Sequence, residues 1–180
     1  MGLRRGFKAE ANRWSRDLRA ELGLLPTDPL CPWELCLFLD IPLTPLSEYR
    51  VAQPRHVDFL QSESGQKQFS AVTYMEGRRR HVIFNDAHDR KRQASDLAHE
   101  IAHALLMHPT HALLNAQGNR VYDRVIEDEA NWLGPALLIS EEAALVAARM
   151  SLAAASDHFR ASREVITMRV NVCGARKRVA

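Results

Sequence analysis

The sequence predicts an α+β fold, in which a small antiparallel sheet is followed by a series of helices. Two short runs of β-branched and aromatic residues, at 69–75 and 81–84, are separated by a turn signal at Glu76-Gly77, which is typical of a hairpin. The periodic segments after residue 89 all have helical spacing. The 180 residues are 46% hydrophobic and 26% charged, so a domain with a real core is expected.

The segment before the sheet is expected to contain a charged helix and a short apolar one. The charged helix covers about 7–21, and Gly23 followed by Pro26 ends it. The apolar helix covers 32–39. Residues 40–45 contain two prolines and are expected to be extended, because a residue before proline avoids the helical region. The signal over 50–68 is weak.

The elements after the sheet are expected to be helices. One long helix runs from about 89 to 107, where Pro109 closes it, and a second covers 123–138. Three shorter helices are expected near 141–149, 151–159 and 162–172. This organisation predicts a main domain over 1–140, a C-terminal helical appendage over 141–174 with possible helix-turn-helix spacing, and a disordered tail over 175–180.

Composition narrows the classes of function. The net charge of +2 argues neither for nor against a nucleic-acid partner. No apolar stretch follows the basic N-terminus, and no run of about 18 apolar residues exists, so we expect neither a secretory signal nor a membrane span. The three cysteines form no C-x-x-C pair and are expected to be reduced thiols, which favours a cytoplasmic location.

The long helix contains a His-Glu-x-x-His motif at positions 99–103. Residues four apart lie on one helix face, so His99 and His103 can direct both imidazoles at one ion. Zinc is well served by two neutral imidazoles and one carboxylate, with water in the open fourth position. Glu100 is rotated by about 100° from His99. It misses the ion but can reach that water, take its proton and later protonate a leaving amine.

Solvated histidines on an amphipathic helix are the simpler interpretation of this motif. The helix is otherwise apolar here, with Ile101, Ala102 and Leu105, so it is expected in the core. Two histidines and a glutamate within a core helix cost free energy unless something satisfies them. The sequence therefore favours a metallopeptidase site.

The third ligand does not follow in the same helix. In one common pattern a glycine and a third histidine come next at fixed spacing, but those positions hold Leu106 and Pro109. His108 and His111 are near, each at the wrong spacing. We interpret them as loop histidines at the helix end, where a partial positive charge suits the helix dipole.

A glutamate on the second helix is the other common solution, and three acids compete for that role. Asp128 falls far from the apolar stripe, whereas Glu127 and Glu129 flank the stripe at similar angles, so periodicity does not choose between them. Two neighbours favour Glu127: the small residue Gly134 permits close approach to the first helix, and Asn131 can accept the free N–H of a metal-bound imidazole.

The two helices together resemble the ImmA/IrrE family of zinc metallopeptidases. Residues 92–103 are similar to its signature helix, and residues 127–138, EDEANWLGPALL, are similar to its second element. The resemblance implies a zincin-like metallopeptidase domain with the small antiparallel sheet packed on the His-Glu-x-x-His helix. It also implies Zn²⁺ as cofactor, Glu127 as the third ligand and Asn131 as the supporting residue.

Two residues depart from the family pattern. Pro135 lies inside the second helix, where it removes a hydrogen bond and is expected to clash with the carbonyl of Asn131. Ser140 stands where the family usually has proline. Neither is a proposed ligand, so the expected consequence is a shift of Asn131.

The favoured hypothesis is a zinc endopeptidase. Zinc is held by His99, His103 and Glu127, and Glu100 is the catalytic base and acid. Several family members cleave a helix-turn-helix repressor, so the resemblance implies a protein substrate of that kind and derepression of target genes. Direct binding to nucleic acid or membrane is not expected. The alternative is a non-proteolytic regulator that binds a repressor or DNA through its C-terminal helices.

Three further features have weaker signals. The strand near 69–74 is a candidate edge strand that receives an extended peptide. The basic stretch 78–80 is interpreted as a solvated turn. Tyr122 and His111 are candidate donors to the oxyanion at the scissile carbonyl, beside a default role in packing or at the surface.

Overall fold

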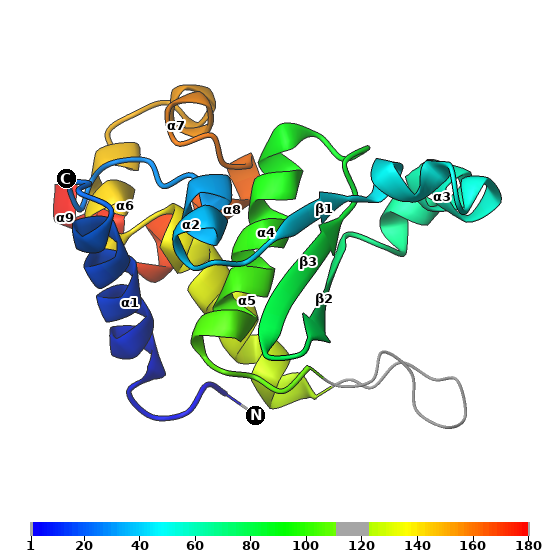
Figure 1. The fold of residues 1–180 in the computed structure, drawn as a ribbon. Helices are drawn as coiled ribbons and strands as arrows, with labels where there is room; N and C mark the ends of the chain where they lie inside the picture. Colours follow the sequence, from blue (N-terminus) through cyan, green and yellow to red (C-terminus); the bar gives the residue numbers. More distant parts are fainter. Residues whose placement is uncertain (1, 111–122, 180) are drawn as a thin grey trace.

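Figure 1 shows the computed structural model, which describes residues 2–110 and 123–179. In chain order the elements are α1 (Phe7–Glu21), α2 (Pro32–Phe38), β1 (Leu43–Pro45), η1 (Leu46–Arg50), α3 (Pro54–Gln61), η2 (Gly65–Lys67), β2 (Ala71–Glu76), β3 (Arg79–Phe84), α4 (Arg90–Leu105), α5 (Arg124–Leu138), α6 (Glu141–Ala147), α7 (Leu152–His158), α8 (Arg163–Val172) and α9 (Ala175–Val179). The sheet packs on α4, α4 packs on α5, and α5 packs on α1.

The sheet contains the expected hairpin and one further strand, in the order β1-β3-β2. β2 and β3 pair antiparallel, whereas β1 pairs with β3 in parallel, with Leu43 opposite Val82. The sheet is therefore mixed rather than purely antiparallel. β1 lies within residues 40–45, which the sequence predicts to be extended. Pro45 is tolerated in this strand because β1 lies at an edge of the sheet.

The hairpin turn is shorter than the sequence indicates. Arg79 and Arg80 belong to β3, so the connection is Gly77-Arg78 alone, and Gly77 has a positive φ of 62°. The interpretation of 78–80 as one solvated turn is therefore wrong. The side chain of Arg79 pairs with Asp40, and Arg80 is partly buried.

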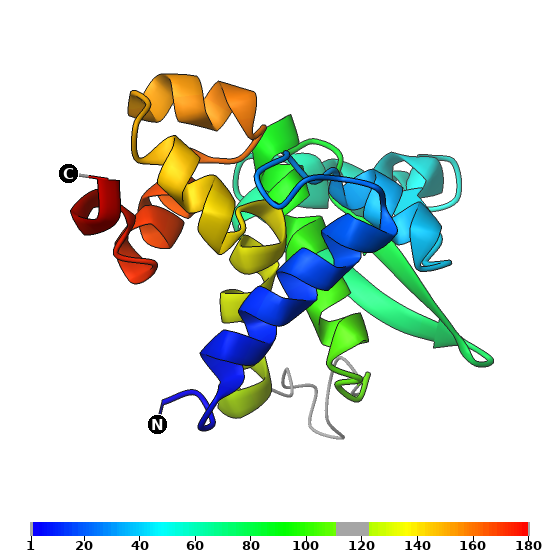
Figure 2. The same ribbon diagram turned by 90° about the vertical axis from the view of Figure 1, so that its left-hand side faces the viewer.

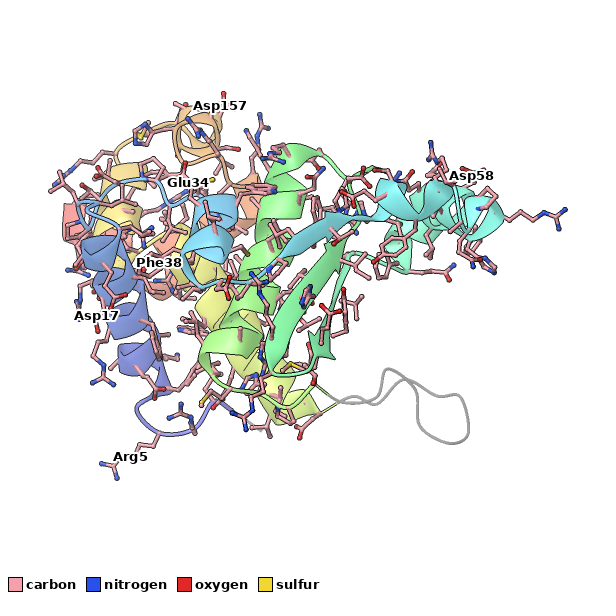
Figure 3. The ribbon with its side chains drawn as sticks, in the orientation of Figure 1. Arg5, Asp17, Glu34, Phe38, Asp58 and Asp157 are labelled. Atoms are coloured by element: carbon pink, nitrogen blue, oxygen red, sulfur yellow. The ribbon has the colours of Figure 1, made fainter. Side chains whose placement is uncertain are left out.

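The weakly patterned segment before β2 forms a small lobe beyond β1, with Asp58 at its outer side (Figure 3). Pro54 opens α3 at a position where a missing N–H costs nothing. Gly65 follows, and a Cβ there would lie 2.0 Å from the backbone oxygen of Phe59. Only glycine permits this close return of the chain.

Helices α4 and α5 carry both sequence motifs and form as expected. The side chains of Asp89 and Asp123 accept backbone N–H groups at their N-termini. Pro135 lies inside α5, which nevertheless continues to Leu138. Gly134 faces α4 so closely that an added Cβ would lie 3.1 Å from the backbone oxygen of Ala98. The prediction that a small residue lets the two helices approach is confirmed.

The C-terminal helices gather at one end of the molecule (Figure 2) around a second hydrophobic cluster. This cluster also includes Ala98 of α4 and Leu138 of α5. Lys91 Nζ of α4 donates to Asp157 Oδ1 of α7 at 2.6 Å, and Asp157 is labelled in Figure 3. The boundary predicted at 140 falls between α5 and α6, and the division into two domains stays a prediction.

Two buried arginines tie the end of α5 to its surroundings. Arg19 of α1 donates to Leu138 O at 3.0 Å, and Arg169 of α8 donates to Ile139 O at 2.8 Å. Both cations therefore satisfy carbonyls at the negative end of a helix. Because Arg169 is only 1% exposed, it has no access to a DNA phosphate. Ser140, where the family usually has proline, caps α6 by accepting the N–H of Ala143.

The end of the described chain, where the sequence predicts a disordered tail, forms a short helix whose charged residues are exposed. α9 covers Ala175–Val179, and Ala175 is fully buried in the second cluster. Arg178 donates to Glu141 at the start of α6. An apolar contact and an ion pair thus attach this helix to the second hydrophobic cluster and to α6.

Candidate metal centre

Two histidines of α4 and one glutamate of α5 meet at a single point. One nitrogen from each of His99 and His103 and one oxygen of Glu127 lie within 4.8 Å of one another. His99 Nε2 is 3.0 Å from His103 Nε2 and 3.3 Å from Glu127 Oε2. His103 Nε2 is 3.8 Å from Glu127 Oε1. The close packing of α4 on α5 at Gly134 brings these side chains together.

These spacings fit a zinc-sized ion. Donor atoms placed tetrahedrally at about 2.0–2.1 Å from zinc would lie about 3.3 Å apart. The two imidazole nitrogens are 3.0 Å apart, and each lies 3.3 or 3.8 Å from one of the two oxygens of Glu127, which is close to that value. Two imidazoles and one carboxylate are also the donor set of many catalytic zinc sites. The residues present therefore fit the metal that the sequence predicts.

The cluster is half-buried, with side-chain exposures of 26% for His99, 14% for His103 and 23% for Glu127. Burial opposes the charged form of His99, but the hydrogen bond to Glu127 and the negative charges of Glu100, Glu127 and Asp96 together outweigh it and raise the pKa of His99. Burial and the neighbouring His99 hold the pKa of His103 well below its usual range. His103 is therefore neutral at physiological pH, the form that binds a metal.

Glu100 lies beside this cluster and is held by the sheet. Thr73 Oγ1 of β2 donates to Glu100 Oε2. Thr73 lies opposite Val82 in the hairpin register, so both side chains face α4. A polar residue within an otherwise β-branched and aromatic strand was the signal that could have indicated Thr73. The prediction that this strand lies at the sheet edge beside the site helix is confirmed.

The two competing glutamates of α5 have different partners. Glu127 lies with the histidines, whereas Glu129 is buried, with 7% exposure, and accepts from Arg4 Nε at 2.7 Å. Its other oxygen, Oε2, is 3.3 Å from His108 Nε2. The structure thus separates two acids that periodicity left equivalent.

His108 lies in the loop after α4, as the sequence predicts, but its ring is buried. Met107 adopts a positive φ of 53° after the end of α4, and the N–H of His108 donates to His103 O at 2.9 Å. This reversal brings the buried His108 ring back, with its Nδ1 3.0 Å from His103 Nδ1. His108 therefore contacts the ring nitrogen of His103 that faces away from His99 and Glu127.

Arg80 is a second residue whose position sequence reasoning missed. Its guanidinium donates to the backbone oxygen of His108, so β3 supports the loop after α4. Burial lowers the pKa of Arg80, and the charge of Glu100 opposes that change. Residues two apart in a strand share a face, so Arg80 lies on the same face as the buried residues Val82 and Phe84. This spacing was the signal that could have indicated its position.

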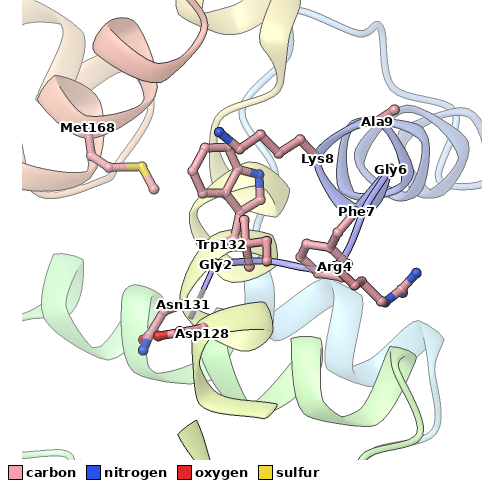
Figure 4. Close-up of a pocket in the computed structure, with 11 residues that line it drawn as sticks. Gly2, Arg4, Gly6, Phe7, Lys8, Ala9, Asp128, Asn131, Trp132 and Met168 are labelled. Atoms are coloured by element: carbon pink, nitrogen blue, oxygen red, sulfur yellow. The ribbon is translucent and has the colours of Figure 1, made fainter. Parts of the chain in front are cut away.

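Asn131 lies one turn after Glu127 and is exposed. It lines a pocket of about 840 Å³ between α5 and the N-terminal segment, beside Trp132 and Gly2 (Figure 4). The hydrogen bonds found in the described part of the chain do not join it to either histidine, and its supporting role stays a prediction. His111 and Tyr122 lie outside the described residues.

Comparison with known proteins adds the family. Residues 54–171, more than half of the chain, match the peptidase M78 model, described as the IrrE N-terminal-like domain. No curated protein and no solved structure matches the chain. Within 2–110 and 123–179, no helix is long and apolar enough to span a membrane. The chain therefore belongs to the peptidase M78 family, which indicates a metallopeptidase-type function and confirms the ImmA/IrrE resemblance of its two helices.

Proposed function

We propose that this protein is a zinc-dependent endopeptidase that cleaves a helix-turn-helix transcriptional repressor and so derepresses target genes. The observation that carries the peptidase part is the convergence of His99, His103 and Glu127 within 4.8 Å, with Glu100 alongside. The repressor as substrate and the cytoplasm as location rest on the family resemblance and on the sequence. Free Cys31, Cys36 and Cys173 agree with a reducing compartment.

The chain's own residues have distinct roles in the proposed reaction. His99, His103 and Glu127 would hold the zinc ion, which supplies a Lewis acid for the scissile carbonyl. Glu100 takes a proton from the attacking water and delivers it to the leaving amine. Thr73 donates to one oxygen of Glu100 and so fixes the direction of the other.

The substrate approaches as an extended peptide in this proposal. β2 pairs with β3 on one side and is one of the two edge strands of the sheet as described. Its free edge can pair with a peptide backbone through main-chain hydrogen bonds, which need no particular side chain. Because β2 carries Thr73, a peptide on this edge lies near Glu100.

Coexpression with the candidate repressor tests the proposal. The parent protein and the Glu100→Ala variant are each expressed with a helix-turn-helix repressor chosen from the genes that flank this one, and fragments are detected by immunoblot and mass spectrometry. We expect fragments with the parent only. Equal fragmentation with the variant contradicts the role of Glu100, and an intact repressor with both proteins contradicts the substrate.

A regulator that acts through its C-terminal helices without proteolysis is less well supported. Of the basic residues in that region, Arg169 is buried and hydrogen-bonded to Ile139 O and to Asn12. Arg149, Arg160, Arg163, Arg176, Lys177 and Arg178 are exposed, so the structure removes only Arg169 from the residues that could contact a phosphate backbone.

A further inference from the structure

We propose that His108, Glu129 and Arg4 form a hydrogen-bonded chain that holds His103 in the orientation and tautomer that a metal requires. This inference rests on the proposed function, because it takes His103 to be a ligand. The chain reaches from α4 through the loop after it to α5 and the N-terminal segment. It thereby joins the candidate metal centre to a residue near the start of the sequence.

The contacts form an unbroken series. His103 Nδ1 is 3.0 Å from His108 Nδ1, and His108 Nε2 is 3.3 Å from Glu129 Oε2. Glu129 Oε1 accepts from Arg4 Nε at 2.7 Å. Arg4 also pairs with Glu10 of α1 at 2.7 Å. Each of the two rings uses both of its nitrogens.

Donor and acceptor roles in this series can be assigned from one end. His103 Nε2 faces His99 and Glu127, so the nitrogen that binds a metal there needs a free lone pair. The proton of neutral His103 then lies on Nδ1 and is donated to His108 Nδ1. His108 must carry its own proton on Nε2, which points at the carboxylate of Glu129. Every contact has one donor and one acceptor.

The central residues of the series are buried, so their contacts differ from ion pairs at the protein surface. His108 and Glu129 are each only 7% exposed. Burying a carboxylate is unfavourable unless it is paired and hydrogen-bonded. The guanidinium of Arg4 and the N–H of His108 supply both requirements. Arg4 itself is about half exposed, so its own desolvation cost is small.

The backbone reinforces this arrangement from two sides. The N–H of His108 donates to His103 O, and Arg80 of β3 donates to the carbonyl of His108. The ring of His108 is therefore placed by a helix end and by a strand. A metal-binding histidine is commonly oriented by a hydrogen bond to its second nitrogen, and loss of such a partner weakens metal binding by about 10–100-fold.

Zinc titration of matched variants tests the inference. Affinity is measured by competition with a chromophoric chelator for the parent and for Glu129→Gln and His108→Phe. The matched control is Asp128→Asn, which makes the same acid-to-amide change one residue away on α5. Asp128 takes no part in the hydrogen-bonded series. We expect the two variants to bind zinc at least about tenfold more weakly, and the control to match the parent.

Nitrogen NMR of the zinc-loaded parent protein shows which ring nitrogen of His108 carries the proton, and it needs no substitution. We expect a proton on His108 Nε2 and none on His108 Nδ1. A proton on His108 Nδ1, or zinc affinity unchanged in both His108→Phe and Glu129→Gln, overturns the inference.

A further variant, Glu127→Ala, separates failure of the inference from failure of the proposed function. If it binds zinc as the parent does, the metal site itself is wrongly assigned. If it loses zinc while His108→Phe and Glu129→Gln bind zinc normally, the assignment of the metal ligands is supported. Only the orienting role of His108 and Glu129 is then refuted.

Discussion

Replacing Gly134 by alanine tests whether close contact between α4 and α5 assembles the metal centre. An added Cβ would lie 3.1 Å from the backbone oxygen of Ala98, 3.1 Å from the backbone nitrogen of His99 and 3.2 Å from the carbonyl carbon of Ala98. These atoms belong to a helix backbone, so they cannot rotate away as a side chain would. The two helices must separate by a few tenths of an ångström at the residue that carries a proposed ligand.

Two opposing effects set the magnitude for Gly134→Ala. Overpacking in a core costs about 1–3 kcal/mol, whereas glycine to alanine inside a helix contributes about 1 kcal/mol of stability. The net expectation is a loss of about 1 kcal/mol, or a fall in Tm of about 2–4 °C for a chain of this size. Zinc affinity should also fall, because the displaced backbone is that of His99.

Thermal melting and zinc titration of the Gly134→Ala variant provide the measurement. Gly2→Ala is the control, since nothing lies within 4 Å of its added Cβ. An unchanged or higher Tm together with unchanged zinc affinity would refute the reasoning, because it would mean that α4 yields without disturbing the site.

Three further predictions follow from other contacts. Thr73→Val should lower kcat by about tenfold with little change in KM, because it removes a hydrogen bond to charged Glu100; Thr73→Ser should retain activity, and equal loss in both variants would contradict the contact. Arg19→Met should lower the free energy of unfolding in urea by about 2–4 kcal/mol, because it leaves Leu138 O and other buried carbonyls without a donor; an unchanged value would contradict this. Burial raises the pKa of the Cys36 thiol to about 12, so a thiol reagent at pH 8 should label it only on unfolding, and rapid labelling of the folded protein would show that it is accessible.

Local signals made the two site helices predictable. Spacing of apolar residues, the capping aspartates and Pro109 act within a few residues, so α4 and α5 follow from the sequence alone. The choice between Glu127 and Glu129 does not, because both flank the buried stripe at similar angles. The structure distinguishes them through Arg4, which is 125 residues away from Glu129 in the sequence.

The errors also have physical reasons. β1 is three residues long, and its pairing with β3 joins positions about forty residues apart, which no local pattern records. The burial of His108 has no local signal either, because it depends on the positive φ of Met107, which turns the loop back toward α4. Arg79 and Arg80 were grouped with Arg78 by charge, although the hairpin register places them in a strand.

A crystal structure of the zinc-loaded protein, with anomalous data collected at the zinc edge, tests the central claim most directly. We predict one zinc peak bound by His99 Nε2, His103 Nε2 and a carboxylate oxygen of Glu127, at distances of about 2.0–2.2 Å. Glu100 should face the open position of that ion. The absence of a peak between these side chains, or a zinc ion bound instead by His108 or Glu129, would contradict the account.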